Sequence, residues 1–151
     1  MKAAFLYQFP AYVEWPASSF AEATSPLVFG VLEADAIADE LSVLSRDKPL
    51  SNRAIVIKKL RLGDSIAGLN VLFIGRSHTR TAIPVMLNAL SSSILTVTEA
   101  PAQRPNGSII NFAIIDDRVS FDVSLPMAGQ AGLTVSSRLL QVARRVIESK
   151  P

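Results

Sequence analysis

Leu27-Val28-Phe29-Gly30-Val31-Leu32 is a continuous apolar run with the length of one β-strand. A strand that is covered on both faces has this composition, because neither of its alternating sets of side chains meets water. Further strands are predicted at 54–57, 71–74 and 94–97, and helices between the strands at 36–44 and 81–90. This alternation predicts an α/β fold, a three-layer sandwich with a mostly parallel, doubly wound sheet.

The two ends of the chain follow different patterns. Residues 108–115 and 118–124 flank the acidic pair Asp116-Asp117, which predicts an antiparallel hairpin at one edge of the sheet. Apolar residues recur at helical spacing over 135–148, so we expect a final helix there. A first helix is predicted from Lys2 to about Phe9, with a break at Pro10, which has no N–H to donate.

Composition limits the classes of protein to which the chain can belong. We expect one domain over residues 1–151, because 49% of the residues are hydrophobic and 19% are charged. No apolar run is long enough to cross a membrane, and a net charge of +2 does not favour nucleic acid. The chain begins in predicted helix, so either it is cytoplasmic or a leader was removed.

Catalytic groups are scarce in this sequence. It has no cysteine and one histidine, His78, so we expect no metal site, no cofactor and no catalytic residue. An enzyme acting on phosphate esters is the weakest alternative, because no acid–base pair accompanies the histidine.

The histidine nevertheless stands where doubly wound folds bind ligands. Arg76, Ser77 and His78 follow the apolar strand at 71–74, and ligands bind beyond the carboxyl ends of such strands. A Ser77 or Thr79 cap on the next helix would leave backbone amides facing an anion. We therefore name Arg76, Ser77 and His78, with Asn111 nearby, as a candidate site for an anion or nucleotide. An ordinary polar loop is the alternative.

Aromatic residues are concentrated at the start of the chain, where the first twenty residues hold six of the ten. A helix packed against the core explains this, and an exposed aromatic face would instead suit a partner. Arginines on the polar side of the predicted final helix would add positive charge to such a binding surface. The candidate partner or dimer interface is Phe5, Tyr7, Phe9, Tyr12, Trp15, Arg138, Arg144 and Arg145.

Several blocks of sequence occur in an order that resembles one family. The segment 2–9 is followed by Glu14-Trp15-Pro16, and later come the blocks at 94–99, 107–112 and 118–123. The last block is Gly132-Leu133-x-Val135-Ser136-Ser137-x-Leu139-Leu140. Together these blocks resemble the YfiR/HmsC-like family over essentially the whole chain.

The resemblance implies a function for which the composition gives no direct sign. Family members are exported to the periplasm, and the best-known kind represses a membrane-bound diguanylate cyclase by binding its periplasmic region. Cyclic-di-GMP signalling, exopolysaccharide output and biofilm formation then fall. The family is α/β, dimer-forming and without established catalysis, so we expect a homodimer that binds no nucleic acid and does not insert into the membrane.

Two features of this chain depart from the family. The best-known member carries disulfide-forming cysteines that make it redox-sensitive. This chain has no cysteine, so redox control is not carried over. Pro10 also stands where the family commonly continues its first helix.

Overall fold

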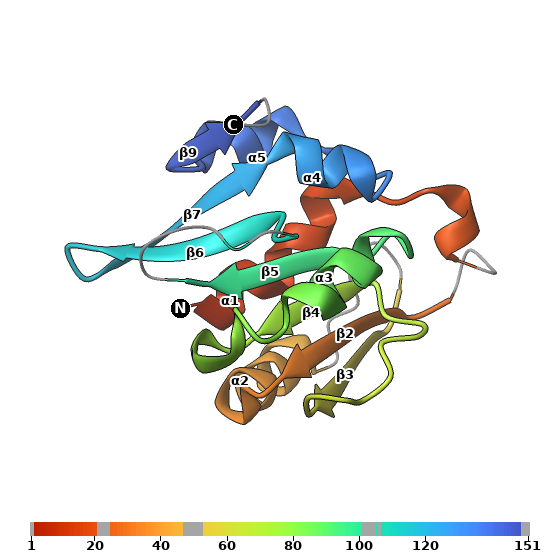
Figure 1. Cartoon of the computed structure of the whole chain (residues 1–151). Helices are drawn as coiled ribbons and strands as arrows, with labels where there is room; N and C mark the ends of the chain where they lie inside the picture. The colour runs from red at the N-terminus through yellow and green to blue at the C-terminus, as the bar shows by residue number, and fades with distance from the viewer. Residues whose placement is uncertain (1, 21–24, 47–52, 101–104, 106, 149–151) are drawn as a thin grey trace.

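The computed structural model describes residues 2–20, 25–46, 53–100, 105 and 107–148. Within these residues, seven strands form one sheet in the order β3-β2-β4-β5-β6-β7-β9. The strands are β2 (Leu27–Leu32), β3 (Ile55–Leu60), β4 (Val71–Ile74), β5 (Leu95–Glu99), β6 (Ile110–Ile115), β7 (Arg118–Ser124) and β9 (Arg145–Ile147). Strands β2 to β6 are parallel, β7 is antiparallel to β6, and β9 is parallel to β7. The predicted mostly parallel α/β sheet is confirmed (Figure 1).

Helices cover both faces of this sheet and make three layers. Helices α1 (Lys2–Gln8) and α2 (Asp35–Ser45) lie on one face, where the larger apolar core includes Leu6, Leu41 and Phe73. Helix α3 (Ile83–Leu90) lies on the other face, over a second core that includes Leu72 and Met86. Each strand of the centre therefore buries both sets of side chains, as the unbroken apolar runs predict.

Pro10 ends the first helix as predicted. Helix α1 stops at Gln8, and the chain continues as the 3₁₀ helix η1 (Phe9–Tyr12), whose first turn holds Pro10. Within an α-helix, proline would remove one backbone hydrogen bond because it has no N–H. In the first turn of a helix the N–H groups have no acceptor inside the helix, so proline loses nothing there. Phe9 is thereby turned into the core, where its ring centroid lies 5.6 Å from that of Phe112.

The predicted final helix over 135–148 is wrong. Instead, the chain forms α4 (Leu125–Gln130), the short strand β8 (Thr134–Val135), α5 (Ser137–Val142) and then β9. The Arg144 N–H donates to the carbonyl of Phe121 over 2.8 Å, which draws the chain onto the sheet after α5. The predicted hairpin of β6 and β7 is present, but β9 rather than the hairpin forms the sheet edge.

A second, two-stranded sheet joins the two ends of the chain. Strand β1 (Val13–Glu14) pairs antiparallel with β8, so that Val13 lies opposite Val135. The N–H of Ser136 also donates to the carbonyl of Tyr12 over 2.8 Å. The N-terminal segment is thus fastened beside α5, far from it in sequence.

Candidate functional site

The predicted anion site falls into two separate places in the structure. Arg76, Ser77 and His78 form the 3₁₀ helix η3 (Arg76–His78), directly after the carboxyl end of β4. Asn111 lies on β6, and the sheet register places it two strands across from Ile74, roughly 10 Å away. The structure therefore groups the first three residues and leaves Asn111 apart from them.

Asn111 has its side chain engaged inside the protein. Its Oδ1 accepts hydrogen bonds from Thr98 Oγ1 at 2.7 Å and from the Ala100 N–H at 2.8 Å. Its Nδ2 donates to the Ala100 carbonyl at 3.2 Å. These bonds satisfy buried polar groups at the end of β5, so Asn111 fixes the backbone there.

The loop at η3 offers one unusual polar atom. Arg76 and Ser77 are exposed, and His78 is half-buried with a buried Nδ1 that has no hydrogen-bond partner among the described residues. Beside it, Gly75 approaches so closely that a Cβ there would lie 2.4 Å from the carbonyl oxygen of Glu33. The backbone therefore fills the gap between the ends of β2 and β4, and any ligand would have to bind outside it.

The predicted helix cap near this loop is wrong. Helix α3 starts at Ile83, and its N-cap residue is Ala82, which contributes no side-chain hydrogen bond. Thr79 is buried, and Ser77 lies within η3. Pro84 sets the start of the helix because it is favoured in the first turn.

The N-terminal aromatic residues form the wall of a groove. The groove encloses about 360 Å³ between α1, η1, β7 and α5. Phe5 and Phe9 both pack on Phe121, with ring centroids 5.9 and 5.1 Å from it. We call this the aromatic groove, and its lining is Phe5, Gln8, Phe9, Tyr12, Phe121, Arg138, Leu139 and Val142.

The structure brings together only some of the predicted interface residues. Phe5, Phe9, Tyr12 and Arg138 line the aromatic groove, although Phe9 is fully buried beneath it. Tyr7 and Trp15 are half-buried outside the lining. Trp15 packs edge-on against Phe20, with ring centroids 6.2 Å apart, and its Nε1 is a buried atom without a hydrogen-bond partner in the described part of the chain.

The three predicted arginines have different surroundings. Arg138 is exposed on α5, and Arg145 is exposed on β9. Arg144 donates from Nε and Nη2 to the two carboxylate oxygens of Asp122, at 2.9 and 2.7 Å. These bonds raise the pKa of Arg144 above its usual value and hold β9 against β7. Arg138 is thus the arginine that faces the groove.

Sequence reasoning missed four residues of the groove. Gln8, Phe121, Leu139 and Val142 complete its lining, and the Val142 side chain is 68% exposed. An apolar residue at helical spacing reads as part of a core, so nothing marked Val142 as exposed. Once β1 and β8 are known to pair, α5 must lie beside η1, and the lining follows.

The described segments hold neither a metal-binding cluster nor a membrane-spanning helix. Among residues 2–20, 25–46, 53–100, 105 and 107–148, no three His, Asp or Glu side chains gather as a metal site. Within the same ranges, no helix has the length and apolar character needed to cross a bilayer.

Comparison with known protein families identifies the family of this chain. A family model described as YfiR/HmsC-like matches residues 1–144, from α1 to the arginine that holds β9. The chain belongs to the YfiR/HmsC-like family. This is a regulatory, non-catalytic family, whose members are known as periplasmic regulators of diguanylate cyclase. No curated protein matches the chain.

The fold explains why two of the YfiR/HmsC-like sequence blocks occur together in one chain. Glu14-Trp15-Pro16 continues from β1, and the Val135-Ser136-Ser137 block continues from its partner β8. Two of the blocks that carry the resemblance to the YfiR/HmsC-like family are therefore neighbours in space. They fix η1 beside α5 and so build two walls of the aromatic groove.

Proposed function

We propose that the chain is a non-catalytic periplasmic regulator that binds the periplasmic region of a membrane-bound diguanylate cyclase and lowers its activity. The family match over residues 1–144 carries this proposal. Cyclic-di-GMP, exopolysaccharide and biofilm would fall as a consequence. The proposal includes export to the periplasm and a dimeric state, both taken from the family.

The aromatic groove is the surface that we assign to the cyclase. Half-buried aromatic rings and one arginine are the side chains most often found at binding hot spots, and Phe5, Tyr12 and Arg138 supply them here. The exposed Val142 adds an apolar rim to the groove. A partner segment with apolar side chains and a carboxylate would complement this surface.

Binding to the purified periplasmic region of the cyclase tests this function. Biolayer interferometry should detect binding at micromolar concentrations, and Arg138→Glu and Val142→Asp should each weaken it about tenfold or more. Val43→Asp is a matched control, because Val43 is 64% exposed on α2, away from the groove. Absence of binding at micromolar concentrations would refute the proposal, as would equal losses in the control.

A small-ligand sensor is the second candidate. The Nδ1 of His78, which has no hydrogen-bond partner within the described part of the chain, favours it. Arg76 stands two residues before His78 and is exposed, so its guanidinium would supply hydrogen-bond donors and a positive charge to an anion at η3. Calorimetry with inorganic phosphate should show binding that Arg76→Ala abolishes and that the nearby, exposed Arg80→Ala control preserves. Equal affinity in wild type and Arg76→Ala would exclude this site.

A further inference from the structure

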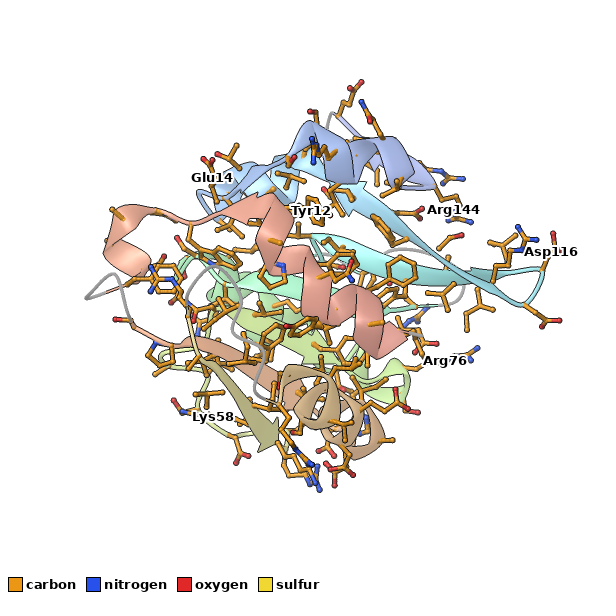
Figure 2. The ribbon with its side chains drawn as sticks, turned by 180° about the vertical axis from the view of Figure 1, so that it is seen from behind. Tyr12, Glu14, Lys58, Arg76, Asp116 and Arg144 are labelled. Atoms are coloured by element: carbon orange, nitrogen blue, oxygen red, sulfur yellow. The ribbon has the colours of Figure 1, made fainter. Side chains whose placement is uncertain are left out.

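The β6–β7 hairpin extends beyond the sheet as a two-stranded arm. Strand β5 pairs with β6 only as far as Phe112, and β9 pairs with β7 only from Asp122. Between these points and the turn, no other described strand flanks the ribbon, which projects from the body of the molecule in both views (Figure 1, Figure 2). A two-stranded ribbon is marginally stable by itself in water. We call residues 113–120 the arm.

The arm exposes large apolar side chains. Ile114 is 51% exposed and Ile115 is 43% exposed, on opposite faces of β6. The pairing of β6 with β7 places Val119 across from Ile114. The two residues of the turn, Asp116 and Asp117, both have positive φ, of 51° and 62°, as a tight hairpin turn requires.

One apolar stripe joins the arm to the aromatic groove. Ile114 and Phe112 share a face of β6, and Val119 and Phe121 share the same face of the paired strand β7. Val119 packs against the core beside Phe121, which itself lines the groove. The stripe therefore runs from the groove outward to the end of the arm, and the turn lies roughly 10 Å beyond Phe121.

The two ends of this stripe carry opposite charge. The tip has the exposed carboxylates Asp116 and Asp117, followed by the exposed Arg118, and so carries a net negative charge. The groove end has the exposed Arg138. Among the described residues, neither the two carboxylates nor Arg138 forms an ion pair. The stripe is consequently complementary to a reversed copy of itself, in apolar character and in charge.

We propose that a second copy of this chain covers the stripe, with the arm of each copy seated over the aromatic groove of the other. A two-fold axis through the stripe makes the two contacts identical, because residue i then meets residue j and residue j meets residue i. The acidic tip of one copy thereby lies at Arg138 of the other. The proposed function assigns the same groove to the cyclase, and this inference rests on it. The second copy and the cyclase therefore compete for the groove. Self-association then determines what fraction of the molecules can bind the cyclase.

Disulfide trapping tests the geometry directly, because the natural chain has no cysteine. An Asp116→Cys chain is mixed with an Arg138→Cys chain and oxidised. We expect a mixed disulfide dimer in high yield. The control pairs Asp116→Cys with Val43→Cys, whose position on α2 lies outside the groove lining. A yield no higher than that of the control overturns the proposal.

Sedimentation velocity on the purified chain tests the energetics. Ile114→Asp should weaken dimerisation about a hundredfold, because burial of one isoleucine is worth about tenfold and the interface contains it twice. Reversing Asp116 and Asp117 to arginine should also weaken it, and adding Arg138→Asp should restore it. Val43→Asp should leave it unchanged, and circular dichroism checks that each variant is folded.

The same measurement separates this proposal from the proposed function. A wild-type chain that is monomeric at about 100 µM overturns the arm–groove dimer, and with it the dimeric state taken from the family, but binding to the cyclase would still support the regulatory function. Dimerisation that is indifferent to Ile114→Asp and to the charge reversal overturns it too. A chain that dimerises through the arm but does not bind the cyclase defeats the proposed function alone.

Discussion

Replacing Phe9 with alanine tests whether the first helix is anchored to the sheet. The Phe9 side chain is 1% exposed, and its ring lies against Phe112 and Phe121. Truncating a buried phenylalanine removes its transfer free energy and leaves a cavity, which together lower the free energy of unfolding by about 3–5 kcal/mol. Both neighbouring rings stand on strands of the sheet and cannot move in to fill the space. We therefore expect a loss in the upper half of that range.

Urea unfolding at neutral pH measures this loss. The midpoint should fall while the slope stays constant, because the surface exposed on unfolding hardly changes. A double-mutant cycle of Phe9→Leu and Phe121→Leu isolates the contact between the rings, and we expect a coupling of about 0.5–1.5 kcal/mol. A loss below about 1 kcal/mol in Phe9→Ala, with no coupling in the cycle, would refute the packing of η1 on the sheet.

Three further changes probe other parts of the fold. Arg144→Ala removes both hydrogen bonds to the buried Asp122 and should lower the free energy of unfolding by about 2–3 kcal/mol; an unchanged melting temperature would contradict this. Asn111→Ala should cost about 1–3 kcal/mol for each buried group that it leaves unpaired, and faster amide exchange at Ala100 should accompany the loss. The hydrogen bond from Arg61 lowers the pKa of Asp35 below 3.8, so the pair stabilises the fold above that pH and is lost as pH falls through the lower folded-state value. Asp35→Asn should therefore have a lower urea midpoint than wild type at neutral pH, and the difference should shrink as the pH falls below the ordinary carboxyl pKa.

The central strands were predictable from the sequence because a strand that is buried on both faces appears as an unbroken apolar run. Residues 27–32 and 71–74 form strands with the predicted bounds. The hairpin was predictable too, since alternation and an acidic turn both mark it. In each case the local pattern and the tertiary environment favour the same structure.

The C-terminal segment shows where local pattern fails. Val146 and Ile147 continue the helical spacing of Leu139 and Val142, but they are β-branched and suit a strand as well. The hydrogen bonds from Arg144 to Asp122 on the neighbouring strand β7 favour the strand over the helix. A partner that lies elsewhere in the sequence cannot be read from a local window.

The candidate site was predictable in its residue types but only in part in its arrangement. The early aromatics and Arg138 are conspicuous as hot-spot residues, and the groove contains Arg138 and three of these aromatics, Phe5, Phe9 and Tyr12. The remaining walls, Phe121 and Leu139, read as ordinary core residues. Their role depends on the pairing of β1 with β8, which joins distant segments and leaves no periodic trace.

The pairing of Val13 with Val135 also dictates an order of events during folding. The ribosome makes α1 well before β8 and α5, which hold it in place. Closing so long a loop costs entropy before any contact is gained, so this pairing forms late. The aromatic groove, whose walls this pairing holds together, is then completed only late in folding. An unfinished chain presents no binding surface, and only completed molecules can take part in regulation.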